Sequence, residues 1–110
     1  MPHMQGISVK GFVVLTLAFR REGTMWLGRC VELSTSTYAR TLEQAKRELV
    51  EMVECHLNTL EEVGERERFL HEHEIEFHTR KQAAAEVRPS LTLDGKSYVQ
   101  ARQFPVSVYA

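Results

Sequence analysis

The sequence predicts an α+β protein in which a mostly antiparallel sheet packs on one long helix. Three observations support this class. Apolar, β-branched segments come first, at residues 9–21, 25–33 and 35–39; one strongly amphipathic segment follows at 41–64; shorter strand-like segments occupy the last third. Strands joined by short turns pair antiparallel, and an amphipathic helix buries its apolar stripe against a neighbouring layer. We therefore expect the order strand, strand, strand, helix, strand, followed by a C-terminal hairpin and strand extension.

The long helix is expected to begin after Thr41 and to stop at Gly64. Thr41 and Gln44 match a T-x-x-Q capping box, in which each side chain satisfies a backbone donor of the first turn. Gly64 can adopt the left-handed conformation that closes a helix. The expected inward stripe consists of Leu42, Ala45, Leu49, Met52, Val53, His56, Leu60 and Val63. The opposite face carries Glu43, Arg47, Glu48, Glu51, Glu54, Asn58, Glu61 and Glu62. The helix should therefore offer solvent or a partner a negative surface.

The first strand is apolar on both faces, which is typical of a strand covered at least partly on each side. Its two faces are Val13, Leu15, Leu17 and Phe19, and Phe12, Val14, Thr16 and Ala18. A short hairpin turn is expected at 22–24. In the second strand, at 25–33, we expect Leu27, Val31 and Leu33 to face the helix, with Trp26, Gly28, Cys30 and Glu32 on the other side. A third strand at 35–39 leads into the helix.

Beyond Gly64, residues 65–73 have the composition of a short helix anchored by Phe69 and Leu70. Alternation at 74–78 predicts a fourth strand that returns to the sheet with Ile75 and Phe77 facing inward.

The C-terminal part begins with a linker-like segment at 80–89. Asp94-Gly95 lies between two strand-like segments, which is the pattern of a type I′ hairpin. Pro105 lacks an amide donor and so confines a last strand, 101–109, to an edge or a bulge. We divide the chain into a core domain, residues 1–78, and an extension, residues 79–110, packed on the same domain or on a partner subunit.

Bulk composition indicates a single soluble domain. The chain has 110 residues, of which 43% are hydrophobic and 26% charged. Its longest apolar run, 12–19, is too short to cross a bilayer, and no signal peptide pattern precedes it, so we expect a cytoplasmic protein. Cys30 and Cys55 have no C-x-x-C spacing, so neither a disulfide nor a zinc site is expected.

The net charge of −1 conceals an asymmetry. Residues 43–76 hold eleven acidic and four basic residues, whereas the rest of the chain holds four acidic and ten basic residues. A segregated field of this kind steers a partner of opposite charge, or it is a solvated helix face.

Three strands followed by a long helix and a further strand begin a ribonuclease-H-like core, which makes a metal-dependent nuclease a candidate. Such enzymes bind two divalent metals with carboxylates from the first strand, the helix and the fourth strand. Glu48 or Glu51 could supply the helix ligand and Glu74 or Glu76 the strand ligand, but the first strand has no acid. We therefore expect no catalytic residue of this type.

Four histidines that lie close in the sequence are candidate metal ligands: His56, His71, His73 and His78. His71 and His73 lack the four-residue spacing of a helical zinc pair, and His56 is expected to pack within the helix stripe. No phosphate-binding or nucleotide-binding motif is present. We expect no cofactor and no metal.

Several short motifs together resemble the HicB-like antitoxin family. They are Arg21-Glu22-Gly23, Trp26, Cys30-x-Glu32-Leu33 and Thr41-Leu42-Glu43-Gln44-Ala45, within residues 9–63. The resemblance implies a partial ribonuclease-H-like fold without catalytic carboxylates. It also implies a non-enzymatic role, the neutralisation of HicA, a small basic ribonuclease toxin, in a toxin-antitoxin system.

Within that interpretation, the partner-binding candidates are Glu43, Glu48, Glu51, Glu54, Glu61 and Glu62, and the structural residues are Trp26, Cys30, Thr41, Leu49, Val53, His56, Leu60 and Gly64. The helices of a sequence-specific DNA-binding segment, found after the domain in many relatives, are not seen in the sequence. Two alternatives stay open. One is a stand-alone homo-oligomer, dimer or tetramer, that pairs through a sheet edge or the C-terminal strand and has no toxin partner; the other is the divergent nuclease.

Overall fold

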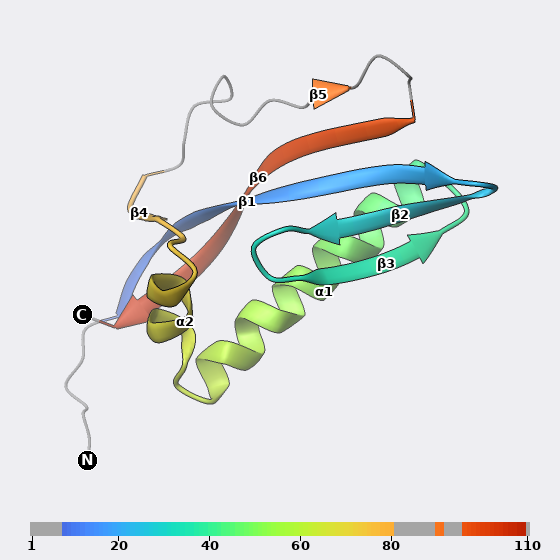
Figure 1. Cartoon of the computed structure of the whole chain (residues 1–110). Coiled ribbons are helices and arrows are strands. Elements are labelled where there is room, and N and C mark those ends of the chain that lie inside the picture. Colours follow the sequence, from blue (N-terminus) through green and yellow to red (C-terminus); the bar gives the residue numbers. More distant parts are fainter. Residues whose placement is uncertain (1–7, 81–89, 92–95, 110) are drawn as a thin grey trace.

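The computed structural model describes residues 8–80, 90–91 and 96–109. Its elements are β1 (Ser8–Glu22), β2 (Met25–Cys30), β3 (Thr35–Ala39), α1 (Leu42–Glu62), α2 (Arg66–Glu72), β4 (Phe77–His78), β5 (Ser90–Leu91) and β6 (Ser97–Tyr109) (Figure 1). The predicted α+β class, with an antiparallel sheet packed against a long helix, is confirmed. The second strand ends three residues earlier than expected, and the fourth contains two residues rather than five.

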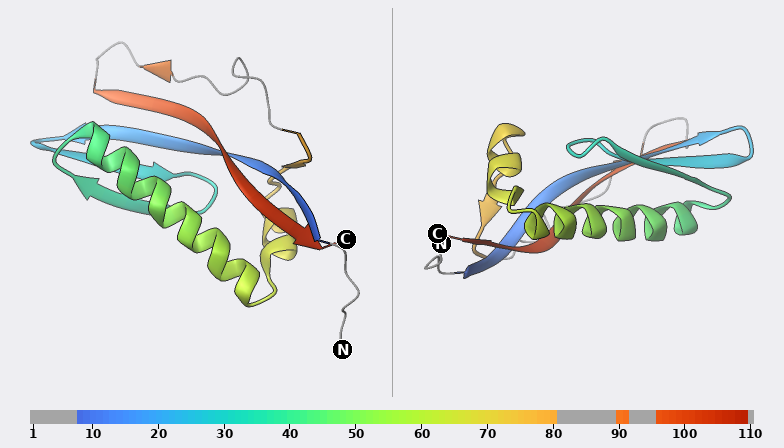
Figure 2. Two further views of the ribbon diagram at one scale, coloured as in Figure 1. Left: turned by 180° about the vertical axis from the view of Figure 1, so that it is seen from behind. Right: turned by 90° about the horizontal axis from the view of Figure 1, so that it is seen from below.

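All the strands join one antiparallel sheet in the order β3-β2-β1-β6-β5. β6 pairs with β1 over residues 8–20, so β2 and β4 share the opposite edge of β1. α1 runs along one face of the β1–β2–β3 meander (Figure 2). The two long central strands give the molecule an elongated shape of 52 × 28 × 21 Å.

Two hydrogen bonds show toward which neighbouring strand the N–H and C=O groups of each β1 residue point. Thr16 accepts a bond from Val31 N (2.9 Å) on the β2 side, whereas Arg21 N donates to Lys96 O (2.8 Å) on the β6 side. Because these directions alternate along a strand, Phe12 also points its backbone groups away from β6. Its partner Pro105 therefore turns its nitrogen to the outer edge of β6. The last strand is therefore not an edge strand along its whole length, since β5 pairs with it at Tyr98 and Val99, but no described strand pairs with its outer side at Pro105.

The β1–β2 hairpin turns as predicted. Glu22 pairs with Met25, which leaves Gly23 and Thr24 as a two-residue turn. Gly23 has a φ of 63°, a conformation that glycine adopts without the steric cost of a Cβ.

The prediction of which β2 side chains face the helix is wrong. Cys30 pairs with Leu17 and Gly28 with Phe19, and residues directly opposite each other lie on the same face of a sheet. Leu17 and Phe19 face α1, so Gly28 and Cys30 do too, while Val31 is exposed. Leu33 lies beyond the strand and is buried, as expected. A Cβ on Gly28 would lie 3.0 Å from the Phe19 ring and 3.5 Å from Leu49 Cδ2, so the small residue permits close approach of the helix.

Both ends of α1 are capped at the predicted residues. Thr41 Oγ1 accepts the N–H of Gln44 at 3.0 Å. The Gln44 amide donates to Glu48 Oε2 at 3.0 Å, so it is not used as the returning half of a capping box. At the other end, Glu65 N donates to Leu60 O and Gly64 N to Glu61 O, with Gly64 at a φ of 74°. This is a Schellman motif.

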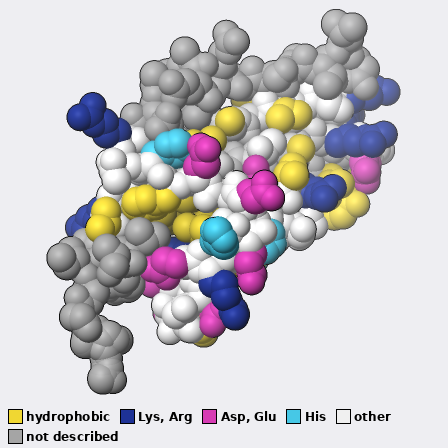
Figure 3. Space-filling model, turned by 60° about the vertical axis from the view of Figure 1, so that its left-hand side comes forward, with side chains coloured by type: hydrophobic (Ala, Val, Ile, Leu, Met, Phe, Trp, Pro, Cys, Tyr) yellow, Lys and Arg dark blue, Asp and Glu magenta, His cyan; other side chains and the backbone are white. Residues whose placement is uncertain are grey.

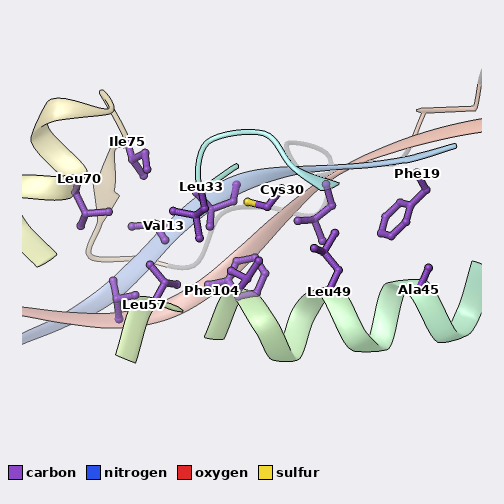
Figure 4. Close-up of a cluster of buried hydrophobic side chains, with 14 of the residues drawn as sticks. Val13, Phe19, Cys30, Leu33, Ala45, Leu49, Leu57, Leu70, Ile75 and Phe104 are labelled. Atoms are coloured by element: carbon purple, nitrogen blue, oxygen red, sulfur yellow. The ribbon is translucent and has the colours of Figure 1, made fainter. Parts of the chain in front are cut away.

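The buried row of α1 is Ala45, Leu49, Val53 and Leu57, at steps of four (Figure 4). These side chains pack against β1 residues and Phe104 of β6. Met52 and Val63, expected in the stripe, are exposed, and Leu57, which was not expected there, is buried. His56 and Leu60 are half-buried at the border. The helix therefore faces the sheet through a narrower row than the sequence pattern predicted.

α2 and β4 close the end of the sheet. Leu70 and Ile75 are buried, and Phe69 and Phe77 pack against the core as predicted. Ser90 pairs with Val99 and Leu91 with Tyr98, a register compatible with the predicted Asp94-Gly95 turn. The turn itself and residues 81–89 lie outside the described residues.

Candidate partner-binding surface

Four of the six predicted partner-binding residues form an exposed acidic ridge on α1: Glu43, Glu51, Glu54 and Glu62. They make two rows, each with a spacing of eleven residues, which is close to three helical turns. At 1.5 Å per residue the ridge is about 28 Å long. Arg47 is the exposed cation among them. The surface is therefore predominantly negative over most of the length of the helix.

The other two predicted residues hold the fold together. Glu48 is half-buried and accepts hydrogen bonds from Thr37 Oγ1 (3.1 Å) and from the Gln44 amide (3.0 Å). Glu61 forms an ion pair with Arg66 at 3.0 Å. Each carboxylate is thus occupied by a neighbour from its own chain, which makes it less suited to bind a partner.

A second surface lies where α1 passes β3. Glu48 bonds to Thr37, and His56 Nδ1 lies 3.3 Å from Thr35 Oγ1, so two α1 residues about two turns apart face the strand. Met52 lies midway between Glu48 and His56 on the same side of the helix, yet its side chain is 39% exposed. An apolar side chain therefore borders the outer edge of the sheet beside the acidic ridge.

His56 also belongs to an aromatic stack. Its ring centroid lies 5.7 Å from that of Phe69, and the Phe69 ring stacks on His73 at 3.9 Å. His73 Nδ1 is 3.0 Å from Phe69 O. These contacts join α1 to α2. The expected packed role of His56 is consistent with this geometry.

The candidate metal-binding carboxylates of α1 and of residues 74–76 do not form one site among the described residues. Glu74 and Glu76 line a pocket of about 230 Å³ with Glu32 and His78, at the gap between β2 and β4. Glu48 and Glu51 lie on α1, and no group of three or more His, Cys, Asp or Glu side chains within the described ranges could hold a metal ion. Figure 3 brings the α2 and β4 end forward, where glutamates lie among histidines and basic residues.

Glu32 has a structural role that the sequence pattern did not predict. Its Oε1 accepts the N–H of Thr16 and its Oε2 accepts the Thr16 hydroxyl, both at 2.8 Å. β2 has ended at Cys30, so the carboxylate continues the hydrogen bonding along the edge of β1. A strand-like sequence pattern carries no sign that a glutamate leaves the ladder in this way.

Arg66 also has a structural role that the sequence pattern did not predict. Its side chain is 3% exposed. It donates to Leu57 O (2.8 Å) and Ser107 O (2.7 Å) and pairs with Glu61. The guanidinium thereby joins the end of α1 to α2 and β6.

The remaining predicted structural residues lie at the sheet–helix interface. Cys30, Leu49 and Val53 are buried in the core, and Trp26 packs against it. Burial raises the pKa of the Cys30 thiol above its usual value of 9.0, and the neighbouring Glu32 charge raises it further. Cys55, in contrast, is exposed on α1.

Comparison of the chain with protein-family models, curated proteins and solved structures found no match. Among the described residues, neither helix is long and apolar enough to span a membrane.

Proposed function

We propose that this chain is a non-catalytic binding protein of the HicB-like kind, which holds a small basic protein on the acidic ridge of α1. The observation that carries the proposal is the ridge itself: four exposed glutamates on a helix fixed to a sheet along its whole opposite side. A rigid row of like charges accelerates the approach of an oppositely charged partner and orients it.

The resemblance names the partner as a HicA-like ribonuclease toxin. It also implies a partial ribonuclease-H-like core. The β1–β2–β3 meander followed by α1 supports that part of the proposal. The neighbour of β1 on its other side is β6, which runs antiparallel to it over thirteen paired positions.

Co-expression with the product of an adjacent reading frame that encodes a small basic protein tests the function. We expect the two chains to elute together in size-exclusion chromatography and the neighbour alone to inhibit growth. The double variant Glu51→Lys/Glu54→Lys reverses two charges of the ridge and should abolish co-elution. The control Glu72→Lys/Glu76→Lys changes two exposed glutamates outside the ridge and should retain the complex. A complex that survives the ridge variant, or a wild-type chain that binds no such neighbour, contradicts the proposal.

A further inference from the structure

The outer edge of β3 presents free backbone hydrogen-bonding groups. Thr16 directs its backbone toward β2, so Ala18 and Arg20 do the same, and their partners in β2 face back toward β1. The intervening residues of β2 bond to Thr35, Thr37 and Ala39 of β3. The N–H and C=O groups of Ser36 and Tyr38 therefore point outward, where no described strand lies.

Within residues 8–80, 90–91 and 96–109, nothing gives this edge the usual protection against strand addition. Natural edge strands are commonly blocked by proline, by charged side chains, by a bulge or by a covering segment. β3 has the sequence TSTYA, with no proline and no charge, and its pairing with β2 is continuous, without a bulge. In Figure 1 it is the outermost strand of the β1–β2–β3 meander, and no other described strand pairs with its outer side. Ser36 is exposed and Tyr38 is 56% exposed.

The helix beneath determines which strand would fit. A strand added beside β3 would direct alternate side chains toward the α1 side of the sheet. Met52 lies nearest on that side of α1, and Glu51 and Glu62 of the acidic ridge lie about a quarter turn further around the helix. Apolar contact followed by negative charge suits long basic side chains, whose methylene stems cover apolar surface while the charged end reaches a carboxylate.

A second copy of the chain fits this edge less well. Antiparallel pairing of β3 with its own copy has a two-fold axis perpendicular to the sheet, so both α1 helices would lie on the same face. Their acidic ridges would then be neighbours, which costs free energy through like-charge repulsion. Charge complementarity favours a basic strand over a copy of this chain.

We infer that the β3 edge binds an extended basic segment of a partner protein as an additional strand of the sheet. The backbone of that segment bonds to Ser36 and Tyr38, and its basic side chains lie over Met52 and reach the acidic ridge. The inference rests on the proposed function, because it specifies how a basic partner is held. Binding then combines main-chain hydrogen bonds at the β3 edge with attraction between the basic side chains and the acidic ridge.

The probe is a short synthetic peptide of alternating lysine and valine, labelled for fluorescence anisotropy. Its control is the same peptide N-methylated at alternate residues, which keeps the charge and removes the donors of one edge. We expect saturable binding of the first peptide and binding weaker by about tenfold or more for the second, because about one kcal/mol per lost hydrogen bond accumulates over the ladder. Hydrogen exchange at the Ser36 and Tyr38 amides should slow when the first peptide binds.

Two variants locate the binding on the protein. Ser36→Pro removes an outward N–H and leaves the bonds to β2 in place, so it should weaken peptide binding about tenfold. Ser36→Ala keeps the N–H and should bind like the wild type. Circular dichroism and thermal melts of both variants verify the fold, and amide exchange in the wild type gives a test that needs no variant.

Equal affinity for the two peptides, or unchanged exchange at Ser36 and Tyr38, overturns the inference, because binding is then a matter of charge alone. A wild-type dimer that Ser36→Pro converts to a monomer also overturns it, since a second copy then occupies the edge. The proposed function fails differently: the ridge variant Glu51→Lys/Glu54→Lys would leave capture of the basic neighbour intact.

Discussion

The carboxylate of Glu32 binds Thr16 at two points, its backbone N–H and its hydroxyl, at 2.8 Å each. One side chain thus replaces a strand at the edge of β1, in the gap between the end of β2 and β4. The arrangement satisfies a backbone donor at an edge where the main-chain ladder has stopped, which a sheet otherwise achieves with another strand or with water.

Glu32→Ala should lower the free energy of unfolding by about 2 kcal/mol, because the Thr16 N–H loses its partner in a partly buried position. Glu32→Gln keeps one acceptor and should cost about 1 kcal/mol. Urea denaturation monitored by circular dichroism measures both. Glu76→Ala serves as the control, since its side chain is 82% exposed, and should stay within about 0.5 kcal/mol of the wild type. If the Glu32 and Glu76 variants are equally stable, the carboxylate does not hold the edge.

Arg66→Met should destabilise the fold by about 3 kcal/mol, because it leaves the carbonyls of Leu57 and Ser107 without their donor. Arg66→Lys should recover only part of this loss, since a single ammonium group cannot reproduce the forked geometry. The control is Arg68→Met, which removes an exposed ion pair with Glu65 and should change stability by less than about 1 kcal/mol. Thermal melts that rank the two methionine variants equally would refute the structural role of Arg66.

The sequence indicated most of the elements because their signals are local. The cap at Thr41, the stop at Gly64, the Gly23 turn and the alternation of β1 each depend on residues within a few positions. The acidic face of α1 followed from helical periodicity in the same way. Register depends on a neighbouring strand, so a local pattern specifies it weakly.

The errors lie where tertiary packing overrides the local pattern. In β2 the larger side chains suggested the wrong inward face, whereas the helix packs over Gly28 and Cys30 because they are small. On α1, tertiary packing likewise departs from the local pattern, because Leu57 is buried and Met52 is exposed. The roles of Glu32 and Arg66 were not predicted, because the hydrogen bonds of Glu32 to Thr16 and of Arg66 to Ser107 join residues 16 and 41 positions apart.

Gly28→Ala should destabilise the protein by about 1–2 kcal/mol, because the added methyl group would crowd the Phe19 ring. Phe19→Leu makes room at that position and should reduce the cost of the second change. A double-mutant cycle by chemical denaturation therefore should give a favourable coupling energy of about 1 kcal/mol between the two sites. Strict additivity would show that the close approach of Gly28 and Phe19 does not limit the packing.

The two cysteines should differ in reactivity toward a thiol reagent. Cys55 is exposed on α1 and should react within the mixing time of the native protein, whereas Cys30 is buried and should react only when the domain opens. The expected result is one fast and one slow thiol, both fast in denaturant. Cys55→Ser should remove the fast phase alone. Two fast thiols in the native protein would contradict the burial of Cys30.

The buried thiol also predicts a loss of stability at alkaline pH. Burial raises the pKa of Cys30 above 9.0, the value expected for the unfolded chain. Between the two pKa values the unfolded state binds fewer protons than the folded state, so the free energy of unfolding is full below pH 9 and falls as the pH rises above it. Urea midpoints measured between pH 8 and pH 10 should therefore decrease, and Cys30→Ala should flatten that decrease.

Tyr38 needs a separate control, because its hydrogen bond to Glu22 raises its pKa above 10.0. Its ionisation would therefore also lower the free energy of unfolding as the pH rises, at a higher pH than that of Cys30. Tyr38→Phe leaves the decrease between pH 9 and pH 10 in place if Cys30 is its source. A decrease that disappears in Tyr38→Phe and persists in Cys30→Ala would assign the alkaline loss to the surface phenol instead of the core thiol.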